Sequence, residues 1–203
     1  MTASKRLFDL TLSLVLGVVL LMPLAVLIIV LLLVEGRPVF YISERMHSPA
    51  RGFALVKLRT MAVHTGDGGV TGGHKSQQLS ALHRLLRRSR ADEIPQLWNV
   101  IRGDMSLVGP RPPLRVYVDD FPDLYAKVLR SRPGVTGLAS LRFHVHEERL
   151  LSACTTAAQT DAVYRRRCVP RKARLDLIYV DHASVCYDLM LIAQTAAKLF
   201  RRD

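Results

Sequence analysis

The hydrophobic pattern of the chain begins with an uncharged apolar run from Leu10 to Val34. At the α-helical rise of about 1.5 Å per residue, this run is long enough to cross a bilayer. It is too long for the apolar part of a signal peptide and no small-residue cleavage pattern follows it, so we expect it to be retained. Pro23 lies near its middle, which predicts a kink or a break in the helix.

Positive residues flank both ends of this run, with Lys5 and Arg6 before it and Arg37 and Arg45 after it. The positive-inside rule therefore assigns no orientation. Two topologies fit: a kinked helix that spans the membrane, and a helix that enters and leaves at the same face. The pattern alone favours the kinked spanning helix, because neighbouring groups can compensate for a proline inside a membrane.

The rest of the pattern predicts a small α/β domain. The alternation in Arg37–Arg45 and Phe53–Met61 is typical of strands, whereas the glycine-rich segment His64–Ser76 predicts a loop. Leu79–Arg88 predicts a basic amphipathic helix, and Asp188–Arg202 predicts another with a basic tail. Both helices could lie on anionic lipid.

Composition narrows the class of protein but does not identify its function. The 203 residues suffice for one domain and one membrane element, and the three scattered cysteines indicate neither a zinc site nor a disulfide framework. The net charge of +12 resides almost wholly after the apolar run. It predicts a polyanionic partner, which composition leaves open among nucleic acid, anionic lipid and phosphorylated substrates.

The most informative polar group is the pair Asp92 and Glu93, for which we expect Asp92 to be the N-cap of a short helix reaching Ile101. Adjacent carboxylates can bind Mg²⁺, and arginines can hold diphosphate oxygens, as phosphoryl transfer requires. A surface ion-pair cluster at a helix N-terminus would explain the same residues. The arginines around the pair are Arg87, Arg88, Arg90, Arg102 and Arg111.

Two further groups are weaker candidates for chemistry. His144 and His146 could project from one face of a strand and share a metal, although surface histidines on an edge strand explain them more simply. The glycines between positions 66 and 73 could cradle a phosphate, but a surface loop explains them as well. We therefore assign no site to either group.

The block RRSRADEIPQLWNVIRGDMSLVGPRP, from Arg87 to Pro112, resembles the signature of the bacterial sugar transferases, which are small monotopic phosphoglycosyl transferases. The resemblance extends over nearly the whole chain. It includes KRLFDL at Lys5, RPVFYISER at Arg37, KLRTM at Lys57 and RPGVTGLASL at Arg132, with LDLIYV and YDLMLIAQT near the end.

This resemblance implies a mostly α, α/β monotopic membrane protein. Residues 1–36 would form a re-entrant helix hairpin broken at Pro23, and residues 37–203 a cytoplasmic catalytic domain with membrane-surface helices on the bacterial inner membrane. Lys5, Arg6 and Asp9 would lie where the helix enters the membrane, anchoring it and contacting lipid head groups. The family commonly has serine before this proline, where this chain has Met22.

The resemblance also implies an activity. Asp92 would attack the β-phosphorus of a UDP-sugar, expel UMP and pass the sugar phosphate to polyprenyl (undecaprenyl) phosphate. Mg²⁺ would be the cofactor, with Asp92 as its ligand, and Glu93 would position the metal or activate the lipid phosphate. The phosphate-binding candidates are Arg87 and Arg111, followed by Lys57 and Arg59.

The chain departs from the family pattern after Ser140, where residues 142–175 replace a Gly-Arg-Asn turn that many relatives carry. The donor sugar is thus left open, as is the choice between monomer and homodimer; exopolysaccharide is the expected type of product. Two rival readings remain. A membrane-tethered nucleic-acid-binding protein should interleave aromatic and basic residues, and aromatics are few, so we expect no nucleic-acid partner. A noncatalytic basic membrane adaptor would not need Asp92.

Overall fold

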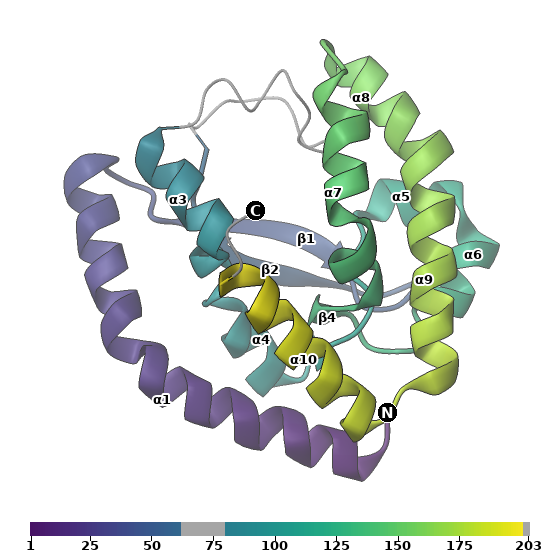
Figure 1. The fold of residues 1–203 in the computed structure, drawn as a ribbon, viewed down its shortest axis with the longest axis horizontal. Coiled ribbons are helices and arrows are strands. Elements are labelled where there is room, and N and C mark those ends of the chain that lie inside the picture. The colour runs from purple at the N-terminus through teal and green to yellow at the C-terminus, as the bar shows by residue number, and fades with distance from the viewer. Residues whose placement is uncertain (62–79, 201–203) are drawn as a thin grey trace.

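The computed structural model describes residues 1–61 and 80–200, and the predicted glycine loop at 64–76 lies outside them. The fold is mostly helical α/β, as the sequence predicts, and it contains two small sheets (Figure 1). Its elements are α1 (Ala3–Val34), β1 (Phe40–Met46), β2 (Gly52–Leu58), α3 (Ala81–Ser89), η1 (Ala91–Glu93), α4 (Gln96–Arg102), β3 (Ser106–Val108), α5 (Arg115–Asp120), α6 (Pro122–Val128), β4 (Gly134–Thr136), α7 (Leu138–Ser152), α8 (Ala157–Val163), the π-helical turn η2 (Tyr164–Cys168), α9 (Val169–His182) and α10 (Val185–Phe200).

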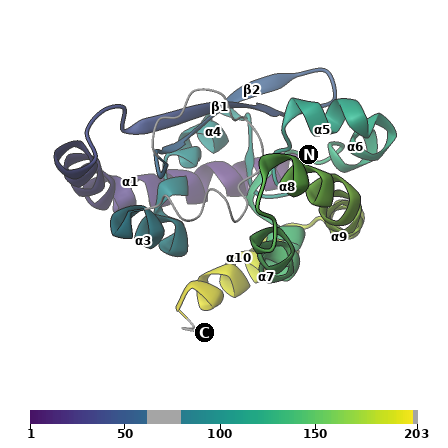
Figure 2. The ribbon, with the colours of Figure 1, turned by 90° about the horizontal axis from the view of Figure 1, so that it is seen from above.

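The first sheet is an antiparallel pair in which β1 runs beside β2, from Phe40 opposite Leu58 to Met46 opposite Gly52. Both predicted strands are confirmed with shifted ends. Figure 2 shows this pair along one side of the body, with α7 and α10 towards the other. The side chains of β2 that face inward, Phe53 and Leu55, are buried in the main core.

The second sheet pairs β3 with β4 in parallel. At its end the two chains approach so closely that a Cβ on Gly134 would lie 2.1 Å from the backbone nitrogen of Gly109. No residue other than glycine fits there. The amide of Gly109 donates to Thr136 O at 2.9 Å, which fixes the start of the following Pro110–Arg111 segment.

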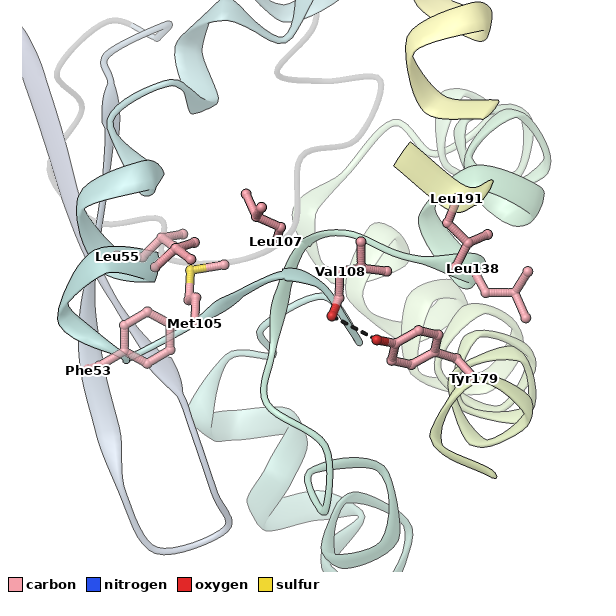
Figure 3. Close-up of a cluster of buried hydrophobic side chains, with 9 residues drawn as sticks. Phe53, Leu55, Met105, Leu107, Val108, Leu138, Tyr179 and Leu191 are labelled. Carbon is pink, nitrogen blue, oxygen red and sulfur yellow. Dashed lines mark hydrogen bonds between the residues drawn. The ribbon is translucent and has the colours of Figure 1, made fainter. Parts of the chain in front are cut away.

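The main core lies between β2, α4, the β3–β4 pair and helices α9 and α10 (Figure 3). Tyr179 is fully buried, and its hydroxyl oxygen lies 2.9 Å from the carbonyl oxygen of Val108. Burial of apolar surface, as in this cluster, is the main favourable contribution to the free energy of folding. The buried members are Phe53, Leu55, Val100, Met105, Leu107, Val108, Leu138, Tyr179 and Leu191.

Helix α1 is continuous from Ala3 to Val34 and contains Pro23. Figure 1 shows that it changes direction along its length, curving around the body, and an internal proline is a common cause of such a bend. It is the one helix in residues 1–61 and 80–200 that is long and apolar enough to cross a membrane. Most of its side chains face outward, and its buried residues are Lys5, Asp9, Ser13 and Leu31.

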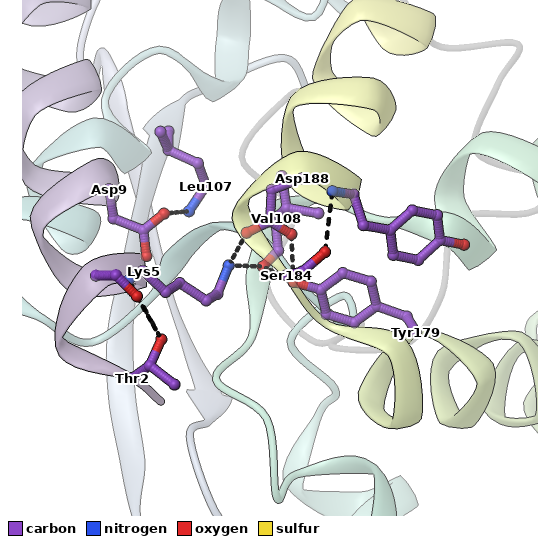
Figure 4. Close-up of polar contacts among 10 residues, drawn as sticks. Thr2, Lys5, Asp9, Leu107, Val108, Tyr179, Ser184 and Asp188 are labelled. Carbon is purple, nitrogen blue, oxygen red and sulfur yellow. Dashed lines mark hydrogen bonds and ion pairs between the residues drawn. The ribbon is translucent and has the colours of Figure 1, made fainter.

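The start of α1 is bound to the domain through polar side chains (Figure 4). Lys5 pairs with Asp188 of α10 and donates to Val108 O at 3.2 Å. Asp9 accepts the amide of Leu107 at 3.2 Å. The side chains of Lys5 and Asp9 therefore face protein and not lipid head groups, and they anchor the helix to the domain.

The end of α1 is bound to the same domain. The hydroxyl of Ser80 donates to the carboxylate of Glu35 at 2.6 Å. Leu31 is buried in a second cluster with Leu58 of β2 and Leu86 of α3. Both ends of the apolar helix thus rest on one folded body.

One predicted strand is wrong. The segment around His144 and His146 lies in α7, where residues two apart point to different sides of the helix. The alternation from Phe143 to His146 is too short to outweigh the helical spacing of buried Leu138, Ala139, Phe143 and Leu151. No group of three or more His, Cys, Asp or Glu side chains that could hold a metal occurs within the described ranges.

Candidate active site

The two carboxylates lie in η1, the single turn between α3 and α4. Arg90 ends α3 in the left-handed conformation with φ of 54°, which redirects the chain into this turn. The predicted N-cap role of Asp92 is wrong, because α4 begins only at Gln96, after Pro95. An N-cap side chain accepts amide hydrogens two or three residues on, and Pro95, the third, has none.

Glu93 is buried and held by two arginines. Arg111 donates to its Oε1 at 2.8 Å and Arg90 to its Oε2 at 3.3 Å. Burial alone would raise the pKa of Glu93, but the guanidiniums of Arg111 and Arg90 outweigh it and lower the pKa. Both carboxylate oxygens are therefore occupied by the protein's own cations.

Asp92 is equally buried, but its carboxylate makes no hydrogen bond or ion pair with residues 1–61 or 80–200. Burial raises its pKa, and so does the charge of Glu93. The charges of Lys57, Arg111 and Arg87 act in the opposite direction. The structure thus places one carboxylate without a direct partner in a field of three cations.

Those three cations come from three separate elements. Lys57 belongs to β2, and its Nζ lies 5.2 Å from the ring centroid of Tyr41. Partial burial and the charge of Arg111 lower the pKa of Lys57 to about 8. Arg87 belongs to α3 and is oriented by a 2.9 Å hydrogen bond from its Nε to the Thr60 hydroxyl. Arg111 follows β3, and the charge of the adjacent glutamate raises its pKa.

Arg59, which the sequence predicts to bind phosphate, makes its hydrogen bonds away from this cluster. Its Nη2 donates to the carbonyls of Glu35 and Gly36, at 2.9 and 3.1 Å. These carbonyls follow the last turn of α1. Arg59 therefore fastens the end of α1.

Sequence reasoning missed other charged residues at the site. Arg45 of β1 donates to Pro112 O at 3.4 Å, and its charge interacts with that of Arg111. His144 of α7 is exposed, and its pKa is lowered by desolvation from the protein atoms around it and by the charge of Arg90. Arg45 could have been found from the sequence, because it is a charged residue within a predicted strand. His144 lies in the segment that departs from the family pattern, and only the tertiary packing of that segment brings it near the site.

The side chains at the site could hold a Mg²⁺ ion only if a substrate supplied most of its ligands. Magnesium usually retains waters and binds one or two carboxylates together with substrate phosphates. Asp92 can supply a carboxylate, whereas both oxygens of Glu93 are engaged by arginines. A donor diphosphate would have to provide further ligands.

A sequence model described as bacterial sugar transferase matches residues 1–202. The chain belongs to the bacterial sugar transferase family. Its family membership and its enzyme class, a polyprenyl-phosphate sugar-1-phosphate transferase, are thereby confirmed as predicted.

Relatives within this family are similar over most of the chain. The uncharacterized sugar transferase EpsL of Bacillus subtilis is 32% identical over 201 residues, covering 96% of this chain and 86% of EpsL. The exopolysaccharide production protein ExoY of Sinorhizobium fredii is 30% identical over 214 residues, covering 95% and 83%. The UDP-glucose:undecaprenyl-phosphate glucose-1-phosphate transferase of Caulobacter vibrioides is 33% identical over 156 residues, covering 74% of this chain and 52% of that protein.

Proposed function

We propose that this bacterial sugar transferase moves a sugar 1-phosphate from a UDP-sugar to undecaprenyl phosphate, through a covalent intermediate on Asp92. The observation that carries the proposal is the contrast between the two carboxylates. Glu93 is neutralised by Arg111 and Arg90, whereas Asp92 is buried among cations without a direct partner in the described ranges. A free carboxylate in a cationic pocket suits attack on a phosphorus.

In the first step, an Asp92 oxygen forms a bond to the β-phosphorus of the donor. The bond from that phosphorus to the oxygen bridging to the α-phosphorus breaks, and UMP leaves with the electron pair. An ionised carboxylate needs no general base for this attack. Arg87, Arg111 and Lys57 stabilise the negative charge on the phosphoryl and leaving-group oxygens.

In the second step, a phosphate oxygen of the lipid attacks the phosphorus bound to Asp92, and the carboxylate leaves unchanged. Glu93 orients Arg111 and Arg90 towards the reacting phosphates through its two hydrogen bonds. When bound, Mg²⁺ would supply charge neutralisation for the diphosphate, and Asp92 would be the residue that holds it.

The attachment of α1 supports a re-entrant membrane hairpin. A straight helix of 32 residues would be about 48 Å long, against a hydrocarbon core of about 30 Å. Yet Lys5 near its start and Glu35 after its end bind the same domain. Residues 1–36 would enter and leave at the cytoplasmic face of the inner membrane, and residues 37–203 would lie on that face, where the water-soluble donor meets the lipid acceptor.

The test is UMP release by the detergent-solubilised protein from a panel of UDP-sugars with Mg²⁺ and undecaprenyl phosphate. We expect Asp92→Asn to abolish release and Asp123→Asn, the same change at an exposed carboxylate in α6, to leave it intact. Wild-type protein given a sugar-labelled donor without lipid should retain the label covalently. Lipid-dependent transfer by folded Asp92→Asn would exclude the mechanism, and no release by the wild type from any donor would favour the noncatalytic adaptor.

A further inference from the structure

A second basic site lies at the opposite end of α4 from Asp92. It is a cleft of about 260 Å³ lined by His47, Asp104 and four arginines, Arg6, Arg51, Arg102 and Arg132. Helix α4 begins after the candidate active site and ends at Arg102. Its seven residues span about 10 Å, and the cleft shares no lining residue with the catalytic cluster.

Two of its arginines are held close together. Arg6 donates to the carbonyls of Val100 and Ile101, at 2.7 and 2.8 Å, and so covers the C-terminal end of α4. A Cβ built on Gly103 would lie 3.4 Å from a guanidinium nitrogen of Arg6 and 3.4 Å from one of Arg132. The two cations thus converge over the backbone of Gly103.

The charge of the cleft is not balanced by its own acid. The Asp104 carboxylate is shared by Asn99 at 3.3 Å and Arg102 at 3.7 Å. Nη1 of Arg132 is buried and makes no hydrogen bond within the described part of the chain. Burial lowers the pKa of Arg132, and the charge of Arg6 lowers it further. An unpaired buried donor is unfavourable, so a ligand with several anionic oxygens would be stabilised here.

The cleft lies where the apolar surface of α1 begins. Arg6 belongs to the first turns of that helix, and Leu7 directly after it is 67% exposed. An adjoining cleft is lined by Met1, Thr2 and Ala3, together with Arg6 and Arg132. Cations at the boundary between an exposed apolar helix and a folded domain lie at the depth of lipid head groups.

We propose that this cleft binds the phosphate of an anionic phospholipid head group. The guanidiniums of Arg132 and Arg51 contact the phosphate oxygens, and Arg6 of α1, held against the C-terminal end of α4, supports them. The proposal rests on the membrane seating of α1 given under the proposed function, but it does not depend on the transfer reaction. It assigns a lipid site separate from the one that receives the undecaprenyl acceptor.

The experiment is native mass spectrometry of the full chain released from micelles containing equal amounts of phosphatidylglycerol and phosphatidylcholine. The test variant is Arg51→Gln/Arg132→Gln. The control is Arg166→Gln/Arg167→Gln, which removes the same charge from two exposed arginines in η2. We expect wild type and control to retain phosphatidylglycerol preferentially, and the test variant to bind it at least about tenfold more weakly.

Equal retention by all three proteins would overturn the site. Stabilisation of the wild type by inorganic phosphate, without retention of phosphatidylglycerol, would overturn the lipid assignment in favour of a soluble anion. Should the double variant not fold, Arg51→Gln alone keeps the test, because this side chain is exposed and makes no hydrogen bond or ion pair within residues 1–61 and 80–200. UMP release measured on the same samples separates this result from the fate of the proposed reaction.

Discussion

At the scale of single residues, burial works against the charge of both Asp92 and Lys57. The pKa of the aspartate is raised and that of the lysine is lowered to about 8. The proposed attack by Asp92 requires the ionised carboxylate, and the proposed phosphate binding by Lys57 favours the protonated lysine. The two requirements define a window of pH in which the free enzyme has both charges.

We therefore expect kcat/KM for the UDP-sugar to fall as the pH rises through about 8, because Lys57 loses its proton there. It should also fall on the acidic side, at a pH above the usual aspartate range, as Asp92 takes up a proton. Lys57→Arg should remove the alkaline limb and keep the acidic one, since arginine stays charged. An alkaline limb unchanged in Lys57→Arg would assign that titration to another group.

Much of the candidate site could be predicted because its central residues are close in sequence. Asp92, Glu93, Arg87 and Arg111 lie in one block that resembles the family signature, and the structure brings them together. The different roles of the two carboxylates could not be predicted, since they depend on which carboxylate the arginines contact in the folded protein. His144 could not be found either, because its approach to the site depends on the packing of α7.

At the scale of elements, α1 is joined to α10 by a buried ion pair. Lys5 and Asp188 are almost inaccessible, and Tyr179 donates to the same carboxylate at 2.7 Å. The ion pair and the tyrosine hydrogen bond give both buried charges a partner. This arrangement fixes the start of α1 against α10.

Lys5→Met should destabilise the protein by about 3–5 kcal/mol, because it leaves the Asp188 carboxylate buried without its cation. Lys5→Met/Asp188→Leu should be destabilised less, since it leaves no unpaired charge. Denaturant unfolding in detergent measures both values, together with that of the single variant Asp188→Leu. If the double variant lost as much stability as the sum of the two single variants, the pair would not be coupled.

The elements that sequence patterns predicted well are those with a long or regular period. The strands β1 and β2, the amphipathic α3 and the apolar α1 all appear near their expected positions. The prediction failed at α7, where a short alternation resembled a strand, and at Asp92, where a nearby proline displaces the helix start. Both failures involve short segments whose conformation is decided by packing or by one missing amide.

At the scale of the whole molecule, the attachment of both ends of α1 to one body predicts that they lie on one side of the membrane. Ser4→Cys and Arg37→Cys, each in a Cys186→Ser background, place single accessible thiols beside the two ends. An impermeant maleimide should label both in inside-out vesicles and neither in right-side-out vesicles. Labelling from opposite sides would instead establish a kinked spanning helix.

Removal of divalent metal should affect turnover and not the fold. The described residues contain no cluster able to hold a metal by itself, so we expect Mg²⁺ to be held jointly with the donor. EDTA should reduce UMP release to background, and added Mg²⁺ should restore it, while the unfolding temperature without substrate stays constant. A lower unfolding temperature in EDTA would indicate a resident structural metal.

The bond between Lys5 and Asp188 also sets an order for biosynthesis. Lys5 precedes its partner by 183 residues, so it leaves the ribosome well before Asp188 is made. Until then the lysine has no counter-charge at its final position, and the apolar helix beside it has no docked base. The later helix α10 therefore completes the attachment of α1, so nascent chains that stop before α10 should be recognised as unfinished by membrane quality-control proteases.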